Sequence, residues 1–169
     1  MAVFGFGRPN VEKLAALNKI DLLVKATKYK KDPAVQEAAR AALLEMMDTC
    51  IKTLQSKHLP HVYAAREALV IIGPPARDRL VFILGEGHVH RRQDAAYVLG
   101  EMRDPEAVPA LTLAMHNPDD LLRKISVEAL AKIGGPDAIE ILRAACLDHD
   151  PHVARAAGKA LNSLGVPRD

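Results

Sequence analysis

Histidine is the residue type in this sequence best suited to hold a metal ion or to titrate near neutral pH. All seven histidines fall at the junctions where one predicted repeat is followed by the next: His58, His61, His88, His90, His116, His149 and His152. Packed helices lie about 8–10 Å apart, whereas metal–nitrogen bonds are only about 2 Å long. We therefore interpret the histidines as loop residues and helix caps along one edge. Weak metal binding or pH sensitivity is the alternative, and we predict no metal and no cofactor.

The sequence contains no recognisable motif for covalent catalysis. It contains no G-x-S-x-G turn and no glycine-rich phosphate loop. Cys50 and Cys146 each lack a neighbouring cysteine and stand in apolar helical contexts. They read as small buried hydrophobic residues in a reducing compartment. These absences predict that the protein is not an enzyme.

The charge pattern argues against nucleic acid and membrane partners. The net charge is only +2, and the one dense basic cluster (Lys25, Lys28, Lys30 and Lys31) is typical of a solvated helix end. In the predicted second helix of each repeat, positively and negatively charged side chains alternate. Such a mixed surface binds the phosphates of nucleic acid poorly. The apolar run in the opening MAVFGFGRP is too short for a signal peptide. The longest apolar runs elsewhere have five residues, too few for a transmembrane helix. We expect a cytoplasmic protein.

The elements that position these residues repeat along the chain. Leu99, Leu130 and Leu161 are spaced 31 residues apart, and the same spacing separates two further triplets: Met102, Ile133, Leu164 and Pro105, Pro136, Pro167. Each period holds two helical patterns split by a Gly- or Asp-Pro turn. This arrangement predicts an α-solenoid, in which each helical hairpin buries its apolar face on the next.

Prolines and capping residues divide the chain into one domain, residues 1–169. We expect Asn10 to cap a helix to Leu17, and Asp21 to cap another to Tyr29, while Phe4 and Phe6 dock on them. A break at Met47-Asp48 is favoured over one long helix from Pro33 to Gln55. The predicted parts are an irregular N-terminus 1–9, a helical cap 10–31, repeats 33–57, 60–85, 88–116 and 119–148, and a half repeat 151–164.

The apolar positions that repeat predict the core, and glycines are expected to close the helices. The expected core triplets of the second helices are Ala76, Ala107, Ala138; Leu80, Leu111, Leu142; and Leu84, Met115, Cys146. The expected closing glycines are Gly73, Gly85, Gly100, Gly134 and Gly165.

Two segments, DAAYVLGEMRDPEAVPAL and VARAAGKALNSLG, resemble the HEAT repeats of the short bacterial and archaeal type, also called phycobilisome-lyase-like repeats. The resemblance runs from Asn10 to Gly165 and is weakest over 46–59. It implies an all-α fold, a right-handed α-α superhelix of about five helical-hairpin repeats. First helices would line the convex side and second helices the concave side.

Deoxyhypusine hydroxylase is an enzyme family that also resembles this array, and its repeats hold a di-iron centre with His-Glu pairs. The matching positions here are Gln93-Asp94, Tyr63-Ala64, Lys124-Ile125 and Arg155-Ala156. One acid and no histidine cannot ligate two irons, so we reject the hydroxylase interpretation. The name of the repeat family also points to bilin lyases, which attach chromophores to phycobiliproteins.

We therefore expect a non-catalytic scaffold or adaptor that binds an unidentified protein as a monomer or weak dimer. A bilin lyase-like subunit and a HEAT-like nucleic-acid-binding protein are the alternatives. Phe82 and Leu113 occupy equivalent positions one repeat apart and form the best contact strip, unless both are tucked against the next repeat. The candidate concave surface comprises Asp78, Val81, Phe82, Pro109, Thr112, Leu113, Glu140 and Arg143.

Overall fold

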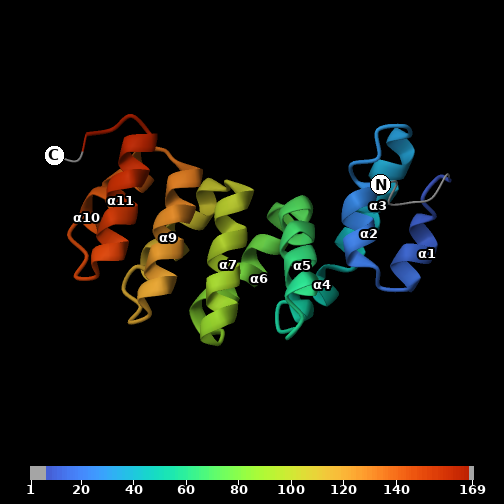
Figure 1. Ribbon diagram of the computed structural model, residues 1–169, viewed down its shortest axis with the longest axis horizontal. Coiled ribbons are helices and arrows are strands. Elements are labelled where there is room, and N and C mark those ends of the chain that lie inside the picture. The colour runs from blue at the N-terminus through green and yellow to red at the C-terminus, as the bar shows by residue number, and fades with distance from the viewer. Residues whose placement is uncertain (1–6, 168–169) are drawn as a thin grey trace. The chain divides into compact units, whose positions relative to one another are not determined.

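The computed structural model describes residues 7–167, and in that range the chain forms α-helices and no strand (Figure 1). The predicted all-α solenoid is confirmed. The packing divides between Ala76 and Arg77 into two units, which are described separately below. The helix α6, Pro74–Glu86, contains this boundary. None of the helices in the described range is long and apolar enough to span a bilayer.

Helices α1 to α5 of the described part of unit 1 pack around a small apolar core, with α2 in contact with α1, α3 and α5. Its largest fully buried side chains are Leu23, Leu43 and Leu69. The helices are α1 (Val11–Ala16), α2 (Ile20–Ala26), α3 (Pro33–Glu45), α4 (Met47–Thr53) and α5 (Leu59–Ile72).

The predicted break in the middle of unit 1 is confirmed, one residue earlier than expected. Met46 leaves the helical conformation with φ −89° and ψ 11° between α3 and α4. Glycine and proline are absent there, so the cause is packing: the turn lets Met46, Cys50 and Ile51 all enter the core. Burial of these side chains outweighs the local helix propensity.

The second helix of the predicted cap starts and ends earlier than the sequence indicated. Asn10 caps α1 as expected, since its side chain accepts a hydrogen bond from the Lys13 N–H at 2.8 Å. Asp21, however, lies inside the first turn of α2, because the chain turns at Asn18 and buries Ile20 as the first helical residue. The Phe4 and Phe6 prediction lies outside the described residues.

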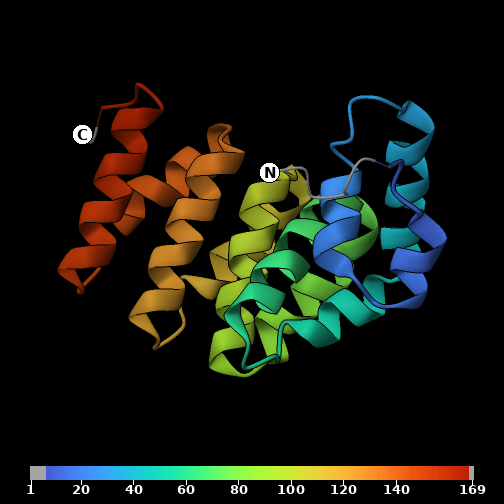
Figure 2. The same ribbon diagram turned by 45° about the vertical axis from the view of Figure 1, so that its right-hand side comes forward.

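Unit 2 stacks its first helices side by side, and α9 contacts both α7 and α11 (Figures 1 and 2). Leu99, Leu130 and Leu161 are fully buried on these helices, as predicted. The elements after α6 are α7 (Val89–Met102), the 3-10 turn η1 (Pro105–Ala107), α8 (Val108–Ala114), α9 (Asp120–Ile133), α10 (Pro136–Ala145) and α11 (Pro151–Ser163).

The second helices α8 and α10 are shorter than expected, and the predicted core of the second helices is only partly correct. The alanine triplet of Ala76, Ala107 and Ala138 and the leucine triplet of Leu80, Leu111 and Leu142 are fully buried. Met115 and Cys146, by contrast, are half-buried, because they lie just beyond the ends of α8 and α10, where the chain has already turned toward the next repeat.

Two of the predicted closing glycines are helical residues instead. Gly85 lies within α6 and Gly100 within α7, which Arg103 closes in the left-handed conformation. Gly100 is buried, and a Cβ there would lie 2.5 Å from the Ala129 Cα and 2.6 Å from its Cβ. This glycine therefore allows α7 and α9 to approach each other more closely than any side chain would.

Alanine at position 100 should destabilise the protein, whereas alanine at position 85 should not. Overpacking typically costs about 1–3 kcal/mol, which exceeds the roughly 0.5–1 kcal/mol that alanine gains over glycine in a helix. Gly85 is the matched control because a Cβ added there would have nothing within 4 Å of it. Urea denaturation of Gly100→Ala and Gly85→Ala measures both effects. Equal stability of the two variants would show that the helices are not in close contact at Gly100.

Candidate functional site

The residues proposed from the sequence as a contact surface lie on three second helices of unit 2. Asp78, Val81 and Phe82 lie on α6, Pro109, Thr112 and Leu113 on α8, and Glu140 and Arg143 on α10. Phe82 is 68% exposed and Leu113 74% exposed, so neither is tucked against a neighbouring repeat. Val81, Thr112 and Arg143 are half-buried. A role of this surface in binding stays a prediction.

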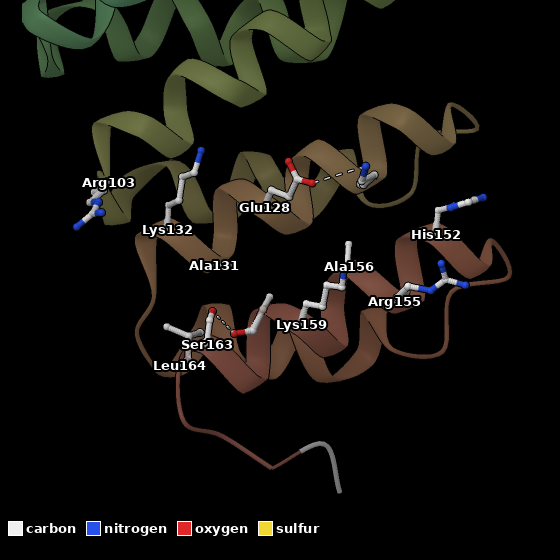
Figure 3. Close-up of a pocket in the computed structure, with 12 residues that line it drawn as sticks. Arg103, Glu128, Ala131, Lys132, His152, Arg155, Ala156, Lys159, Ser163 and Leu164 are labelled. Atoms are coloured by element: carbon white, nitrogen blue, oxygen red, sulfur yellow. Dashed lines mark hydrogen bonds and ion pairs between the residues drawn. The ribbon is translucent and has the colours of Figure 1, made fainter.

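A groove of 810 Å³ runs between α9 and α11 on the first helices of unit 2 (Figure 3). We call it the cationic groove. Sequence reasoning missed it, because its residues form no motif and come from separate repeats. Its charged and titratable lining comprises Arg103, Lys124, Glu128, Lys132, His152, Arg155 and Lys159, and its apolar lining includes Ala131, Ala156, Ala160 and Leu164.

The charges of the cationic groove are unbalanced in favour of cations. Five lysines and arginines line it against a single carboxylate, Glu128. Glu128 lies 3.8 Å from the Lys124 ammonium, and Lys132 reaches Glu101 on α7 at 2.5 Å. Within residues 7–167, Arg155 and Lys159 have no carboxylate partner, and both are exposed. These two cations are available to an anionic ligand.

The spacing of Arg155 and Lys159 defines what they can bind together. They are four residues apart on α11, so their side chains project from the same face about 6 Å apart along the helix axis. Figure 3 shows both residues on α11, with the Arg155 side chain extending toward His152. Small alanines beside them leave the space between the helices open. The groove therefore suits a ligand with an apolar body and two nearby anionic groups.

A buried ion pair holds the helices that frame the groove. The Arg123 guanidinium on α9 donates from Nε to Asp148 Oδ2 at 2.9 Å and from Nη2 to Oδ1 at 3.0 Å. It also donates from Nη1 to the carbonyls of Asn117 and Pro118. The pair therefore ties the start of α9 to the turn between α10 and α11. This hydrogen bonding by Arg123 lowers the pKa of the Asp148 carboxyl.

The same role recurs one repeat earlier, which the sequence could have revealed. Arg92 precedes Arg123 by one repeat period and donates from Nε to the Gly87 carbonyl at 2.6 Å. Each arginine thus satisfies carbonyls of the turn that precedes its own helix. Arg92 and Arg123 therefore each hold the turn that precedes their helix in place.

The residues present do not fit a di-iron centre. Lys124 and Arg155 stand where the hydroxylase pattern has ligands, and both line the cationic groove. Asp94 is buried, and Gln93 donates from its amide to Asp119 at 2.8 Å. Among residues 7–167, no three His, Cys, Asp or Glu side chains are grouped so as to hold a metal ion. A surface rich in lysine and arginine also repels cations.

Comparison with known families identifies the class of protein. A model described as HEAT repeats matches residues 78–162, half of the chain, and the chain belongs to this family. The computed structure is similar to that of human deoxyhypusine hydroxylase in complex with glycerol. The TM-score is 0.58 at 24% identity, over 90% of this chain and 65% of that one. At this level of identity, the likeness shows the fold.

The sequence is also similar to parts of individual characterised proteins. Deoxyhypusine hydroxylase-B of Oryza sativa subsp. japonica is 31% identical over 98 residues, which cover 57% of this chain and 32% of the relative. Bilin biosynthesis protein PecE of Mastigocladus laminosus is 40% identical over 81 residues, 47% of this chain and 30% of the relative. The chain thus matches about a third of the length of each.

These relatives correct two expectations drawn from the sequence. The chain was expected to be a non-catalytic scaffold and not an enzyme, whereas the matched hydroxylases are named for an enzymatic activity. Both expectations are wrong. They relied on missing motifs, and a repeat fold can build a ligand site from single residues contributed by several helices, which no motif search detects.

Removal of Asp148 should destabilise the protein strongly, and the effect should depend on pH. Asp148→Ala leaves Arg123, whose side chain is only 3% exposed, without its counter-charge, at a cost of about 3 kcal/mol. Because the folded-state pKa of Asp148 is lowered, the pair stabilises the fold above the ordinary aspartate pKa of about 3.9. The stabilisation is lost as pH falls from there through the folded-state pKa.

Chemical denaturation of the wild type and Asp148→Ala from pH 7 down to pH 3 measures this difference. Asp137→Ala is the control, since Asp137 is an exposed aspartate in the first turn of α10 and should cost below about 1 kcal/mol. A difference between wild type and Asp148→Ala that stays constant across the acid range would contradict the assigned ion pair.

Proposed function

We propose that this chain is a bilin lyase-like subunit that binds a linear tetrapyrrole in the cationic groove. The cationic groove is the observation that carries the proposal, and the 40% identity to a bilin biosynthesis protein supports it. The matched region of that relative is only part of its length, so the proposal concerns the ligand that this chain holds.

The chemistry of a linear tetrapyrrole matches the lining of the groove. Such a molecule is a conjugated, largely apolar chain of four pyrrole rings that carries two propionate groups on its two central rings. Arg155 and Lys159 present two cations one helical turn apart and pair with the two carboxylates. Charge-assisted bonds from arginine to a carboxylate are strong and directional.

The apolar part of the ligand is accommodated by small side chains. Ala131 on α9 and Ala156 and Ala160 on α11 line the groove between the charged residues. Alanine leaves more room than a larger aliphatic side chain, so a flat ring system has space between the helices. The volume of 810 Å³ lies within the range of about 300–1,000 Å³ usual for small-molecule sites.

A protein partner is part of the proposal, because a subunit that holds a bilin must deliver it. The exposed Phe82 and Leu113, with the other predicted contact residues of α6, α8 and α10, remain our candidate surface for that partner. We propose a cytoplasmic location, which the two unpaired cysteines, Cys50 and Cys146, support. Burial raises the pKa of the Cys50 thiol to about 11. Such a thiol is unreactive at neutral pH.

Titration with biliverdin, followed by absorption and induced circular dichroism, tests the proposal. We expect saturable binding that weakens as salt is added, because the cations are exposed. The double substitution Arg155→Glu with Lys159→Glu should weaken binding at least about tenfold, equivalent to about 1.4 kcal/mol. The dimethyl ester of biliverdin should bind the wild type and the double variant equally, because it lacks both carboxylates.

The matched control changes net charge by the same amount away from the groove. Arg40 and Lys52 are exposed residues of α3 and α4, and Arg40→Glu with Lys52→Glu should bind biliverdin like the wild type. Failure of the wild type to bind biliverdin, or equal affinity of the Arg155/Lys159 variant, would contradict the proposal.

A further inference from the structure

A second, smaller pocket lies where α6 leads into α7, and none of its residues belongs to the cationic groove. Its volume is 250 Å³, and it is lined by Arg79, Phe82, Ile83, Glu86, Gly87 and Arg91. The six residues span only thirteen positions of the chain, so the pocket is built locally within unit 2. It is separate from the cationic groove, while Phe82 also belongs to the predicted contact surface.

Gly87 forms a wall of this pocket that only glycine permits. Its N–H donates to the Ile83 carbonyl at 2.8 Å, and a Cβ on Gly87 would lie 2.5 Å from that oxygen. The chain therefore turns tightly off the end of α6. This turn places Arg91, in the first turn of α7, beside Phe82 on α6.

Arg91 has hydrogen-bonding capacity that the described protein atoms leave unused. Its Nε is buried, and no acceptor for it is present among residues 7–167. The neighbouring Arg92 shows the contrast, because its Nε donates to the Gly87 carbonyl. A buried N–H without an acceptor is unfavourable, so a ligand that supplies an oxygen gains binding energy there. The start of α7 also favours negative charge.

The other half of the pocket is apolar and open. Phe82 is 68% exposed and Ile83 lies buried beneath the surface. Arg79 adds a second positive charge to the lining, and the exposed Glu86 carries the one negative charge. The lining therefore has a net positive charge next to an accessible aromatic ring. This combination is selective for an anion with an attached apolar group.

We propose that this pocket binds a carboxylate that carries a short apolar chain. The Arg91 Nε–H is covered in the structure, so the half-buried side chain rotates to pair its Nε–H and a terminal N–H with the carboxylate. The apolar chain of the ligand covers Phe82. Two sources have this chemistry: a free short-chain carboxylic acid, or an acidic side chain beside an apolar one in a partner protein.

The Nε–H signal of Arg91 in ¹⁵N–¹H NMR spectra of the full chain provides a direct test. We expect hexanoate to shift this signal saturably, whereas hexanamide, which has the same chain without the charge, should not. A helical peptide with leucine and glutamate four residues apart is the second probe. Tighter binding of the peptide would identify a protein as the source, and tighter binding of hexanoate a free acid.

Two variants separate the contributions of charge and apolar contact. Because Arg91→Gln lacks the Nε–H signal, binding to the variants is followed by the backbone amide signals of the pocket residues. Arg91→Gln should abolish saturable binding of both probes, and Phe82→Ser should weaken it at least about fivefold, while Arg40→Gln should leave it unchanged. Unchanged amide spectra away from the substitution establish that each variant is folded. The inference is overturned if neither probe shifts the Arg91 Nε–H signal, or if Arg91→Gln binds either probe like the wild type.

Discussion

The contact between Gly100 and Ala129 sets the spacing on which the stacking in unit 2 depends. At this point α7 approaches α9 so closely that a single methyl group on Gly100 would collide with the Ala129 backbone. One repeat later the equivalent positions are Ala131 and Ala160. Ala131 has a Cβ where Gly100 has none, so α11 cannot approach α9 in the same way. Both alanines line the cationic groove, which therefore forms where this closest approach is missing.

The charged residues of unit 2 fall into two groups. Some form buried ion pairs that stabilise the fold, and others are exposed cations that can bind a ligand. Arg123 is bonded to Asp148 and to two carbonyls, and Arg77 bonds Asp104 at 2.9 Å. Both arginines form their hydrogen bonds at the junctions between repeats. Arg155 and Lys159, in contrast, have no carboxylate partner in the described part of the chain. The residues available for a ligand are therefore the exposed cations that take no part in the junctions between repeats.

The relation to deoxyhypusine hydroxylase shows how one repeat position can serve different chemistry. The positions that the sequence resemblance assigns to ligands in that family carry Lys124 and Arg155 here, and the structure places both in the same groove. Lys124 and Arg155 thus put positive charge on the first helices, which disfavours a metal cation there. A HEAT array supplies a surface on which such changes cost little, because these side chains are exposed or half-buried.

The sequence by itself determined the helical repeats, most of their bounds and the main core positions. A period of 31 residues with leucines at fixed places is compatible with few folds, and apolar burial enforces it locally within each hairpin. Even the break at Met46 followed from comparing repeat lengths. The role of Gly100, the ion pair of Arg123 with Asp148 and the cationic groove were decided by the tertiary structure. Each depends on side chains about one repeat apart that meet only when the helices stack, and sequence periodicity does not encode how closely they approach.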